Sequence, residues 1–266
     1  YPEAWVLKCR SPDRLEKVAS GHAVLTASGT VLMRGYTTGT TAAAACKAAI
    51  LSLSARITSV RISTPCGLVL DVPVSADGGR AECRKFAGDH PGDVTRGILF
   101  AATASVQESG IEVIPGTGIG RYARDTPRFK KGTPAITPAP LACILRSMEE
   151  AMGETGVSGA NVTLSVPDGE KVAANTLNSR VGVEGGISIL GTTGLVEPWD
   201  DHLTASALDR IARSPRVVLT TGRIGLRYAR LRYPDYDVVL VGAKIGDALA
   251  AAEKEVILFG LPALVL

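Results

Sequence analysis

Short apolar runs rich in β-branched residues alternate with polar, glycine-containing segments in the second half of the chain, as is typical of buried strands in an α/β sheet. The strands predicted from these runs cover residues 161–166, 186–190, 216–220, 238–241 and 256–259. Residues 201–214 and 248–254 have helical spacing. Because the last four strands each run into small or polar residues, we expect these loops to share one edge of a parallel sheet, where ligands bind in doubly wound folds. The pattern predicts a Rossmann-like α/β domain over residues 156–266.

The first half of the chain mixes strand-like alternation with two helical stretches. The predicted strands cover residues 59–65, 68–74, 81–85 and 111–115, the first two forming a hairpin around Cys66-Gly67. The Ala-rich run after Thr41 is an excellent helix former with Thr40 or Thr41 as its cap, and residues 141–152 predict a second helix. Small polar residues and Gly cluster at 153–159, so we expect a boundary there and an α+β domain over residues 1–155.

The stretch GGISILGTTGLVEP, residues 185–198, combines a predicted strand with a loop that suits ligand binding. The apolar residues 187–190 lead directly into Gly191-Thr192-Thr193-Gly194, at the position just past a strand where ligands sit in open sheets. Exposed backbone N–H groups and Thr hydroxyls there can bind a carboxylate or a phosphate. On spacing alone, a strand followed by an ordinary tight turn is the simpler interpretation.

A second Gly/Thr-rich loop, RGYTTGTT at residues 34–41, precedes the Ala-rich helix. A loop that feeds a helix start presents free N–H groups and the positive end of the helix dipole, and so predicts an anion site. A well-capped helix packed tightly on a sheet explains the alanines equally well. The sequence lacks G-x-x-x-x-G-K-[ST], so the loop is not a P-loop.

Two further segments carry candidate binding residues. In AGDHPGDVTRG, residues 87–97, Asp93 suits a helix cap before the apolar residues 98–106, whereas Asp89 has no such structural explanation. GTGIG, residues 116–120, has the wrong glycine spacing for a dinucleotide fingerprint. The residues that follow it are basic and could hold a polycarboxylate, although most charge runs are solvated faces: Arg121, Arg124, Arg128, Lys130 and Lys131.

Composition and charge exclude several classes of function. With 45% hydrophobic residues and a formal net charge of +3, the chain is neither disordered nor basic enough for a nucleic-acid binder. No apolar run reaches the length of a membrane span, and no signal-peptide pattern is present, so we expect no membrane partner. The five scattered Cys lack a C-x-x-C pair and predict reduced thiols in a cytoplasm. His22, His90 and His202 have no ligand spacing, so no protein-held metal is expected.

The segments RGYTTGTTAAAA, AGDHPGDVTRG, GTGIGRYAR and GGISILGTTGLVEP, in this order, resemble the CbiD family over roughly residues 34–262. Members of that family are cobalt-precorrin-5B C1-methyltransferases of anaerobic cobalamin (vitamin B12) biosynthesis. The resemblance implies that the chain transfers a methyl group from S-adenosylmethionine to a carbon of a tetrapyrrole substrate, with cobalt present only as part of that substrate.

On the basis of this resemblance, we hypothesise separate roles for the two motif loops. The residues expected to bind S-adenosylmethionine are Gly191, Thr192, Thr193, Gly194 and Glu197. The residues expected to bind the carboxylate-rich macrocycle are Arg34, Tyr36, Thr37, Thr38, Gly39, Thr40, Asp89, Gly118, Gly120 and Arg121. The reverse assignment stays open, because the motifs carry no ligand poses.

Methyl transfer from a sulfonium is an in-line displacement that depends on alignment and needs little acid–base chemistry, which agrees with the lack of a visible triad. Two other classes of function remain. A small-molecule kinase could use the Gly/Thr loop for phosphates, although a loop Lys and a Mg²⁺-binding acid pair are missing. A non-catalytic tetrapyrrole-binding protein would need no signature base at all. A homo-oligomer is compatible with either alternative and with the enzyme.

Overall fold

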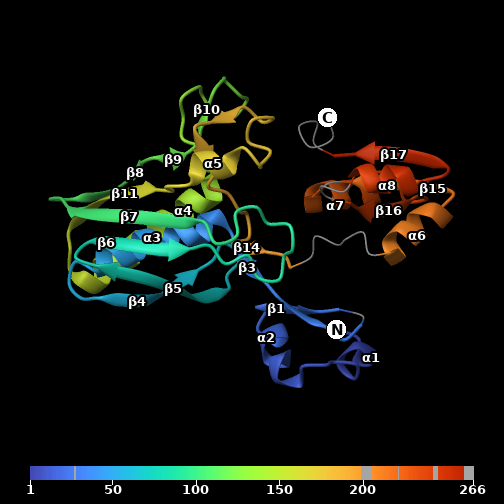
Figure 1. Ribbon diagram of the computed structural model, residues 1–266, viewed down its shortest axis with the longest axis horizontal. Coiled ribbons are helices and arrows are strands. Elements are labelled where there is room, and N and C mark those ends of the chain that lie inside the picture. Colours follow the sequence, from blue (N-terminus) through green and yellow to red (C-terminus); the bar gives the residue numbers. More distant parts are fainter. Residues whose placement is uncertain (27, 199–204, 221, 242–244, 261–266) are drawn as a thin grey trace. The chain divides into compact units, whose positions relative to one another are not determined.

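The computed structural model describes residues 1–26, 28–198, 205–220, 222–241 and 245–260, and the chain forms two compact units (Figure 1). Unit 1 is Tyr1–Pro198 and unit 2 is Trp199–Leu266. The boundary expected at residues 153–159 therefore falls inside unit 1. The physical reason is strand β11 (Gly159–Ser165), which begins there and pairs with two strands of the unit 1 sheet.

A six-stranded sheet forms the body of unit 1. In spatial order its strands are β4 (Ile57–Ser63), β5 (Val69–Asp77), β6 (Arg80–Arg84), β7 (Leu99–Val106), β11 and β8 (Gly110–Pro115). All neighbours are antiparallel except β11 and β8, which run parallel. Buried and exposed residues alternate strictly along β5, so one face of this strand faces the core and the other faces water. The predicted hairpin and the strands at 81–85 and 111–115 are confirmed.

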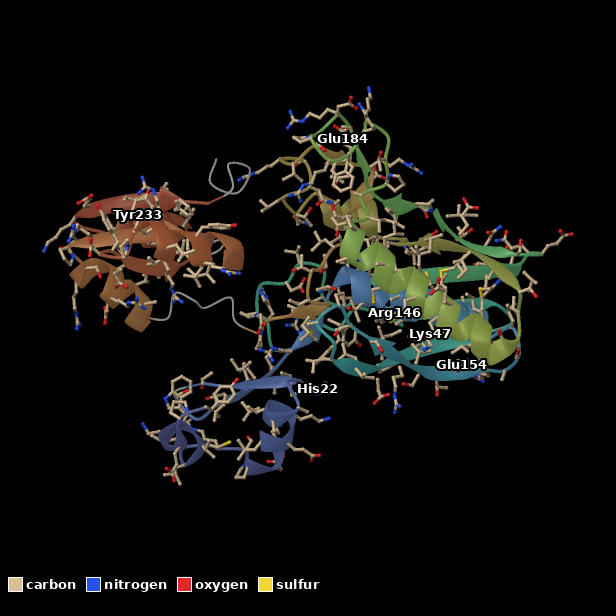
Figure 2. The ribbon with its side chains drawn as sticks, turned by 180° about the vertical axis from the view of Figure 1, so that it is seen from behind. His22, Lys47, Arg146, Glu154, Glu184 and Tyr233 are labelled. Atoms are coloured by element: carbon tan, nitrogen blue, oxygen red, sulfur yellow. The ribbon has the colours of Figure 1, made fainter. Side chains whose placement is uncertain are left out.

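Helix α3 (Thr38–Leu51) lies between the sheet and helix α4 (Pro138–Thr155) and is buried on every side except at its last residue (Figure 1). Its alanines permit this, because small side chains let the sheet and α4 both approach the helix backbone. Lys47 is the charged residue inside this layer. Its Nζ donates to Glu150 Oε2 at 2.7 Å and lies 3.6 Å from Glu154 Oε1, so both partners come from α4 (Figure 2).

Short elements complete unit 1. The N-terminal segment contains α1 (Glu3–Val6), η1 (Pro12–Arg14), α2 (Leu15–Ala19), β1 (Ala23–Leu25) and β2 (Val31–Met33). Further along the chain lie β3 (Gly35–Tyr36), β9 (Gly118–Ile119), β10 (Arg121–Tyr122), α5 (Gly169–Ala173), β12 (Val183–Glu184), β13 (Gly186–Ile187) and β14 (Leu195–Val196). Strand β3 pairs with β14, and β9 pairs with β13, so segments separated by more than 60 residues lie side by side.

Unit 2 is an α/β layer structure with a parallel sheet. It contains α6 (Ala205–Arg213), β15 (Arg216–Thr220), α7 (Gly222–Arg232), β16 (Asp237–Leu240), α8 (Ile245–Ala251) and β17 (Glu255–Phe259). Val217 and Leu219 of β15 pack with residues of α6 and α8, and Val218 packs on α7 from the opposite face. The sheet order is β16-β15-β17, which is 2-1-3 in chain order and belongs to the flavodoxin-like variant of the doubly wound folds.

The predicted α/β class is confirmed, and three local expectations are corrected. The strand at 186–190 does not join the parallel sheet of unit 2; its first residues form β13 and pair with β9 in unit 1. The apolar residues 98–106 contain strand β7, Leu99–Val106, and no helix. Asp93 therefore caps no helix, and its Oδ1 accepts instead from the N–H and hydroxyl of Thr95 in a local turn. The start of the helix expected at 201–214, together with residues 221 and 242–244 of the predicted loops, lies outside the described residues.

Candidate functional site

The start of helix α3 is capped by Thr37. The Oγ1 atom of Thr37 accepts from the N–H of Thr40 at 3.3 Å, and its carbonyl accepts from the N–H and the hydroxyl of Thr41. The cap expected at Thr40 or Thr41 thus lies three or four residues earlier, because β3 ends at Tyr36 and the chain turns directly into the helix. All four threonines at this helix start are buried, Thr40 with 1% exposure.

The two Gly/Thr-rich loops bind each other. Thr38 Oγ1 accepts from the N–H of Leu190 at 2.9 Å and donates to the carbonyl of Ser188 at 3.1 Å or of Leu190 at 3.2 Å. The N–H of Gly39 donates to the Leu190 carbonyl at 3.1 Å. The positive end of α3 therefore faces carbonyl oxygens of the chain itself, which corrects the expectation of an open anion site at this helix start.

A second set of contacts fixes the other end of the Gly191–Gly194 loop. The Gly194 carbonyl accepts from the N–H of Thr37 at 3.0 Å and from Thr40 Oγ1 at 2.8 Å. Gly191 has a φ of +131°, and a Cβ atom there would lie 2.5 Å from Thr37 Cβ. The loop needs glycine at this position both for its backbone conformation and for the close approach to α3.

The opposite side of the loop rests on the turn between β4 and β5. The N–H of Cys66 donates to the Thr193 carbonyl at 3.2 Å, and Thr193 Oγ1 bonds to the backbone of Leu195. Thr192 is exposed, and its hydroxyl has no hydrogen-bond partner among the described residues. The loop is thus held from two sides and presents the Thr192 hydroxyl outward.

Arg34 joins the segment before β3 to the segment after β14. Its Nε donates to Glu197 Oε2 at 2.9 Å, and its Nη1 donates to the Gly21 carbonyl at 2.8 Å. Arg34 and Glu197, expected to serve different ligands, therefore form one ion pair with side chains 20% and 22% exposed. Asp89 lies at the same segment, where its Oδ2 accepts from the N–H of Met33 at 2.7 Å.

A cavity of about 370 Å³ opens beside Arg34. Its apolar lining includes Tyr36, Phe86 and Leu70, and its polar lining includes Lys17 and Asp71. The rings of Tyr36 and Phe86 meet at a centroid distance of 5.7 Å. Burial, with a smaller effect of Cys83, raises the pKa of Tyr36 to about 12, so its hydroxyl stays protonated at neutral pH.

Asp93 of the motif at residues 87–97 forms a buried ion pair with Lys85, the residue before Phe86 of the cavity lining. Lys85 Nζ binds Asp93 Oδ2. Burial lowers the pKa of Lys85, and the hydrogen bond and charge of Asp93 offset this only in part. Burial by itself raises the pKa of Asp93, but hydrogen bonds from Lys85 and Thr95, with the Lys85 charge, hold the pKa of this carboxyl below its ordinary value.

Gly118, Gly120 and Arg121 lie at a different place, on β9 and β10. A Cβ atom at Gly120 would lie 2.7 Å from the Gly186 carbonyl, and one at Gly118 would lie 2.9 Å from the Val166 carbonyl carbon. Both glycines thus allow β9 to pack closely against its neighbours and so support β13, which leads into the 188–194 segment.

The basic run stands on an exposed loop of the same region. Arg121 Nη1 donates to the Gly132 carbonyl at 2.9 Å, and the Lys130–Asp125 pair is 3.5 Å long and solvent-exposed. Arg121 lies opposite Glu184 in the β10–β12 ladder, at the tip labelled in Figure 2. A contact of this loop with the macrocycle stays a prediction.

Of the residues predicted from the sequence, the structure brings together Arg34, Tyr36, Thr37–Thr40, Asp89, Gly191–Gly194 and Glu197. Sequence reasoning missed the cavity residues Phe86 and Lys17, and also Asn178, whose Nδ2 donates to the Gly186 carbonyl and whose Oδ1 accepts from Ser188 Oγ. Phe86, Lys17 and Asn178 lie outside any recognisable motif, so nothing in the sequence indicated a functional role for them.

The described residues contain neither a cluster of metal-binding side chains nor a helix that could span a membrane. Within the described ranges, no three His, Cys, Asp or Glu side chains converge in a way that could hold a metal ion. In the same part of the chain, no helix combines the length and the apolar character that crossing a bilayer requires.

The comparisons with known proteins agree on one family. The CbiD family model matches residues 26–198, and this match ends where unit 1 ends. The cobalt-precorrin-5B C(1)-methyltransferase of Methanoregula boonei is 65% identical over 266 residues, which are 100% of this chain and 80% of that protein. The protein of the same name from Methanoculleus marisnigri is 56% identical over 269 residues, again 100% of this chain and 80% of that protein.

A solved structure matches both units of the chain. The crystal structure of a cobalamin biosynthesis protein (CbiD) from Archaeoglobus fulgidus superposes with a TM-score of 0.73 at 43% identity. The match covers 99% of this chain and 88% of that one. The fold described above is therefore also the fold of that protein.

Proposed function

This chain belongs to the CbiD family, and we propose that it is a cobalt-precorrin-5B C1-methyltransferase that uses S-adenosylmethionine. The observation that carries the proposal is the high identity to relatives of that name over the full length of this chain. The substrate is a tetrapyrrole, and its cobalt is part of the substrate. The relatives support neither a small-molecule kinase nor a non-catalytic binding protein.

The chemistry fits a site without a catalytic triad. Transfer of a methyl group from a sulfonium to an electron-rich ring carbon is an in-line displacement, in which orientation of the two reactants can supply up to ~7–11 kcal/mol. A rigid binding surface serves this purpose better than a mobile one. The Gly191–Gly194 loop, held by α3 on one side and by the β4–β5 turn on the other, is such a surface.

We assign the S-adenosylmethionine contacts to this loop. The outward hydroxyl of Thr192 can bond the co-substrate, and the carboxylate of Glu197 can accept from ribose hydroxyls or from the amino group. Glu197 is held in place by Arg34 at 2.9 Å, so it need not be reoriented on binding. Arg34, Tyr36 and Asp89 then face the macrocycle. The helix start of α3 acts as the support of the loop, because its threonine hydroxyls are used inside the fold.

Calorimetric titration with S-adenosylhomocysteine tests the loop assignment. We expect micromolar binding to the wild-type chain, and at least tenfold weaker binding to Thr192→Ala and to the Thr192→Ala/Thr193→Ala double variant. The matched control is Thr103→Ala/Thr163→Ala, which removes two exposed threonines from the outer face of the sheet and should leave binding unchanged.

The results distinguish an error in the assignment of the binding loop from an error in the proposed activity. Unchanged affinity in the double variant would remove S-adenosylmethionine from the loop while leaving the enzyme activity intact. Failure of the wild-type chain to methylate cobalt-precorrin-5B in the presence of S-adenosylmethionine would overturn the function itself.

A further inference from the structure

The cavity beside Arg34 has an unusual inner wall. Tyr36 is only 9% exposed, yet its hydroxyl has no hydrogen-bond partner among the residues that the structure describes. The hydroxyl oxygen itself is not closed off from solvent, so it is accessible from the cavity. Because the Tyr36 side chain packs in the core of unit 1 and also lines the cavity, a bound ligand can accept a hydrogen bond from this hydroxyl.

Arg34 adds further unused donors at the same wall. Its guanidinium has five N–H donors, and the structure uses two of them, one to Glu197 and one to the Gly21 carbonyl. These two bonds fix the plane of the guanidinium. The remaining donors are free, within the described part of the chain, to form the forked bonds that a carboxylate accepts.

The rest of the lining defines what kind of group fits. Phe86, which is 44% exposed, offers part of its ring to the cavity beside Leu70 and Pro73, so the walls suit an apolar stem. Lys17 adds a second positive charge. The carboxylate in the lining, Asp71, has a side chain that is 77% exposed and pairs with Arg61 at 3.6 Å.

We propose that this cavity binds a carboxylate carried on a short apolar arm, with Arg34 and the Tyr36 hydroxyl donating to its oxygens and Phe86 packing against the arm. The proposal rests on the proposed function, which provides two sources of such a group: an acetate or propionate arm of the tetrapyrrole, and the methionine end of S-adenosylmethionine. The cavity favours the tetrapyrrole arm. The methionine end carries an ammonium group beside its carboxylate. The positive charges of Arg34 and Lys17 in the lining repel that ammonium group, and the Asp71 carboxylate in the lining is 77% exposed and paired with Arg61.

The test uses Tyr36→Phe in the full chain, which removes the hydroxyl and keeps the ring. The probes are uroporphyrin, a tetrapyrrole with acetate and propionate arms, and S-adenosylhomocysteine. We expect Tyr36→Phe to weaken uroporphyrin binding about tenfold, since a hydrogen bond to a charged group is lost, and to leave S-adenosylhomocysteine binding unchanged. The matched control is Tyr122→Phe, a tyrosine stacked on Phe129 outside the cavity, which should change neither affinity.

A stability measurement separates ligand binding from a structural role. Because the Tyr36 hydroxyl has no hydrogen-bond partner among the described residues, Tyr36→Phe should unfold at the same temperature as the wild type or higher. A lower melting temperature, an unchanged uroporphyrin affinity, or a wild-type chain that does not bind uroporphyrin would each overturn the proposal. Weaker S-adenosylhomocysteine binding with unchanged uroporphyrin binding would also overturn the tetrapyrrole assignment. All of these outcomes leave methyl transfer by the wild type untouched, so they are distinguishable from failure of the proposed function.

Discussion

Two strand-to-helix junctions of this chain combine threonine and glycine, and they differ in how the threonines are satisfied. At the start of α3 in unit 1, the hydroxyls of Thr38, Thr40 and Thr41 all bond to backbone atoms, two of them to a segment about 150 residues away. At the end of β15 in unit 2, Thr220 is fully buried, and its hydroxyl has no partner among the described residues.

Glycines allow close packing at both junctions, with different results. Gly39 lies against Pro140, and Gly191 lies against Thr37, so that the α3 junction is locked by contacts from two other segments. Gly225 of α7 lies against the side chain of Thr220, five residues earlier in the chain. Similar local sequences therefore have different outcomes. The threonine hydroxyls are hydrogen-bonded at the α3 junction, where the fold brings acceptors from distant segments, and the Thr220 hydroxyl is unsatisfied at the α7 junction, where no such acceptor is present among the described residues.

The largest expected effect on the free energy of unfolding is that of disrupting the close contact between Gly191 and Thr37. Gly191→Ala places a Cβ atom against Thr37 and requires a backbone conformation that alanine disfavours. We expect the strain and the overlap together to lower the free energy of unfolding by about 4 kcal/mol. Urea unfolding followed by circular dichroism measures it.

Gly185→Ala is the matched control for this prediction. Gly185 also has a positive φ, of +75°, but a Cβ atom there would meet nothing within 4 Å. The free energy of unfolding of this variant should fall by only about 1–2 kcal/mol, which is the cost of the backbone conformation. Equal losses in both variants would show that contact with Thr37 does not matter.

Isosteric Thr→Val substitutions at the two junctions should change the stability in opposite directions. Thr38→Val removes the hydroxyl that binds Ser188 and Leu190 and should destabilise unit 1 by about 2 kcal/mol, because buried backbone groups lose their partner. Thr220→Val removes a hydroxyl that has no partner and should stabilise β15 by about 1 kcal/mol.

Amide hydrogen exchange measures these two effects separately in each unit, because exchange reports local opening free energies. Thr192→Val, at an exposed hydroxyl without a described partner, is the control and should change the free energy by less than about 0.5 kcal/mol. Destabilisation of β15 by Thr220→Val would mean that the Thr220 hydroxyl has a stabilising role, and the contrast between the junctions would fail.

The smallest expected effect comes from acid, which acts on the buried Lys85–Asp93 ion pair of unit 1 and not on the threonines of the α3 junction. The folded-state pKa of Asp93 lies below its unfolded value of about 3.9, so its ion pair with Lys85 stabilises the fold above that pH. This contribution is lost as the pH falls through the folded-state pKa. We expect the urea midpoint of unit 1 to fall between pH 5 and pH 3, by about 5–10% of its value at pH 6.

Asp93→Asn provides the control for the acid effect. It removes the titrating group, so the stability of this variant should be lower at pH 6 and should change less between pH 5 and pH 3 than that of the wild type. A wild-type midpoint that rises on acidification would contradict the direction of the Asp93 pKa shift.

Much of the fold was predictable because its signals are local. The alternation along residues 57–85 predicted the hairpin and the next strand, and the alanines after Thr41 predicted α3. The parallel strands of unit 2 and its helices α6 and α8 followed from short apolar runs and helical spacing, whereas α7 was not predicted. The motif blocks also indicated the family, which the comparisons confirmed.

The site was predictable as a set of motifs but not as an arrangement. Thr37–Thr40 and Gly191–Gly194 were assigned to different ligands, which stays a prediction, and the sequence did not show that the two loops are hydrogen-bonded to each other. The strand before Gly191 was placed in the wrong sheet, because periodicity shows that a strand is buried and does not show which neighbour pairs with it.

The sequence by itself determined α3, α4, the β4–β5 hairpin, the strands of unit 2, the glycine positions and the family, since these depend on short-range propensity and on motif identity. Only the tertiary structure decided which threonines point into the fold, which remain outward, and that Tyr36, Phe86 and Lys17 share a cavity. The physical reason is that a hydroxyl or a guanidinium is satisfied by whatever acceptor lies within hydrogen-bond distance. In this chain that acceptor belongs to residues far away along the sequence.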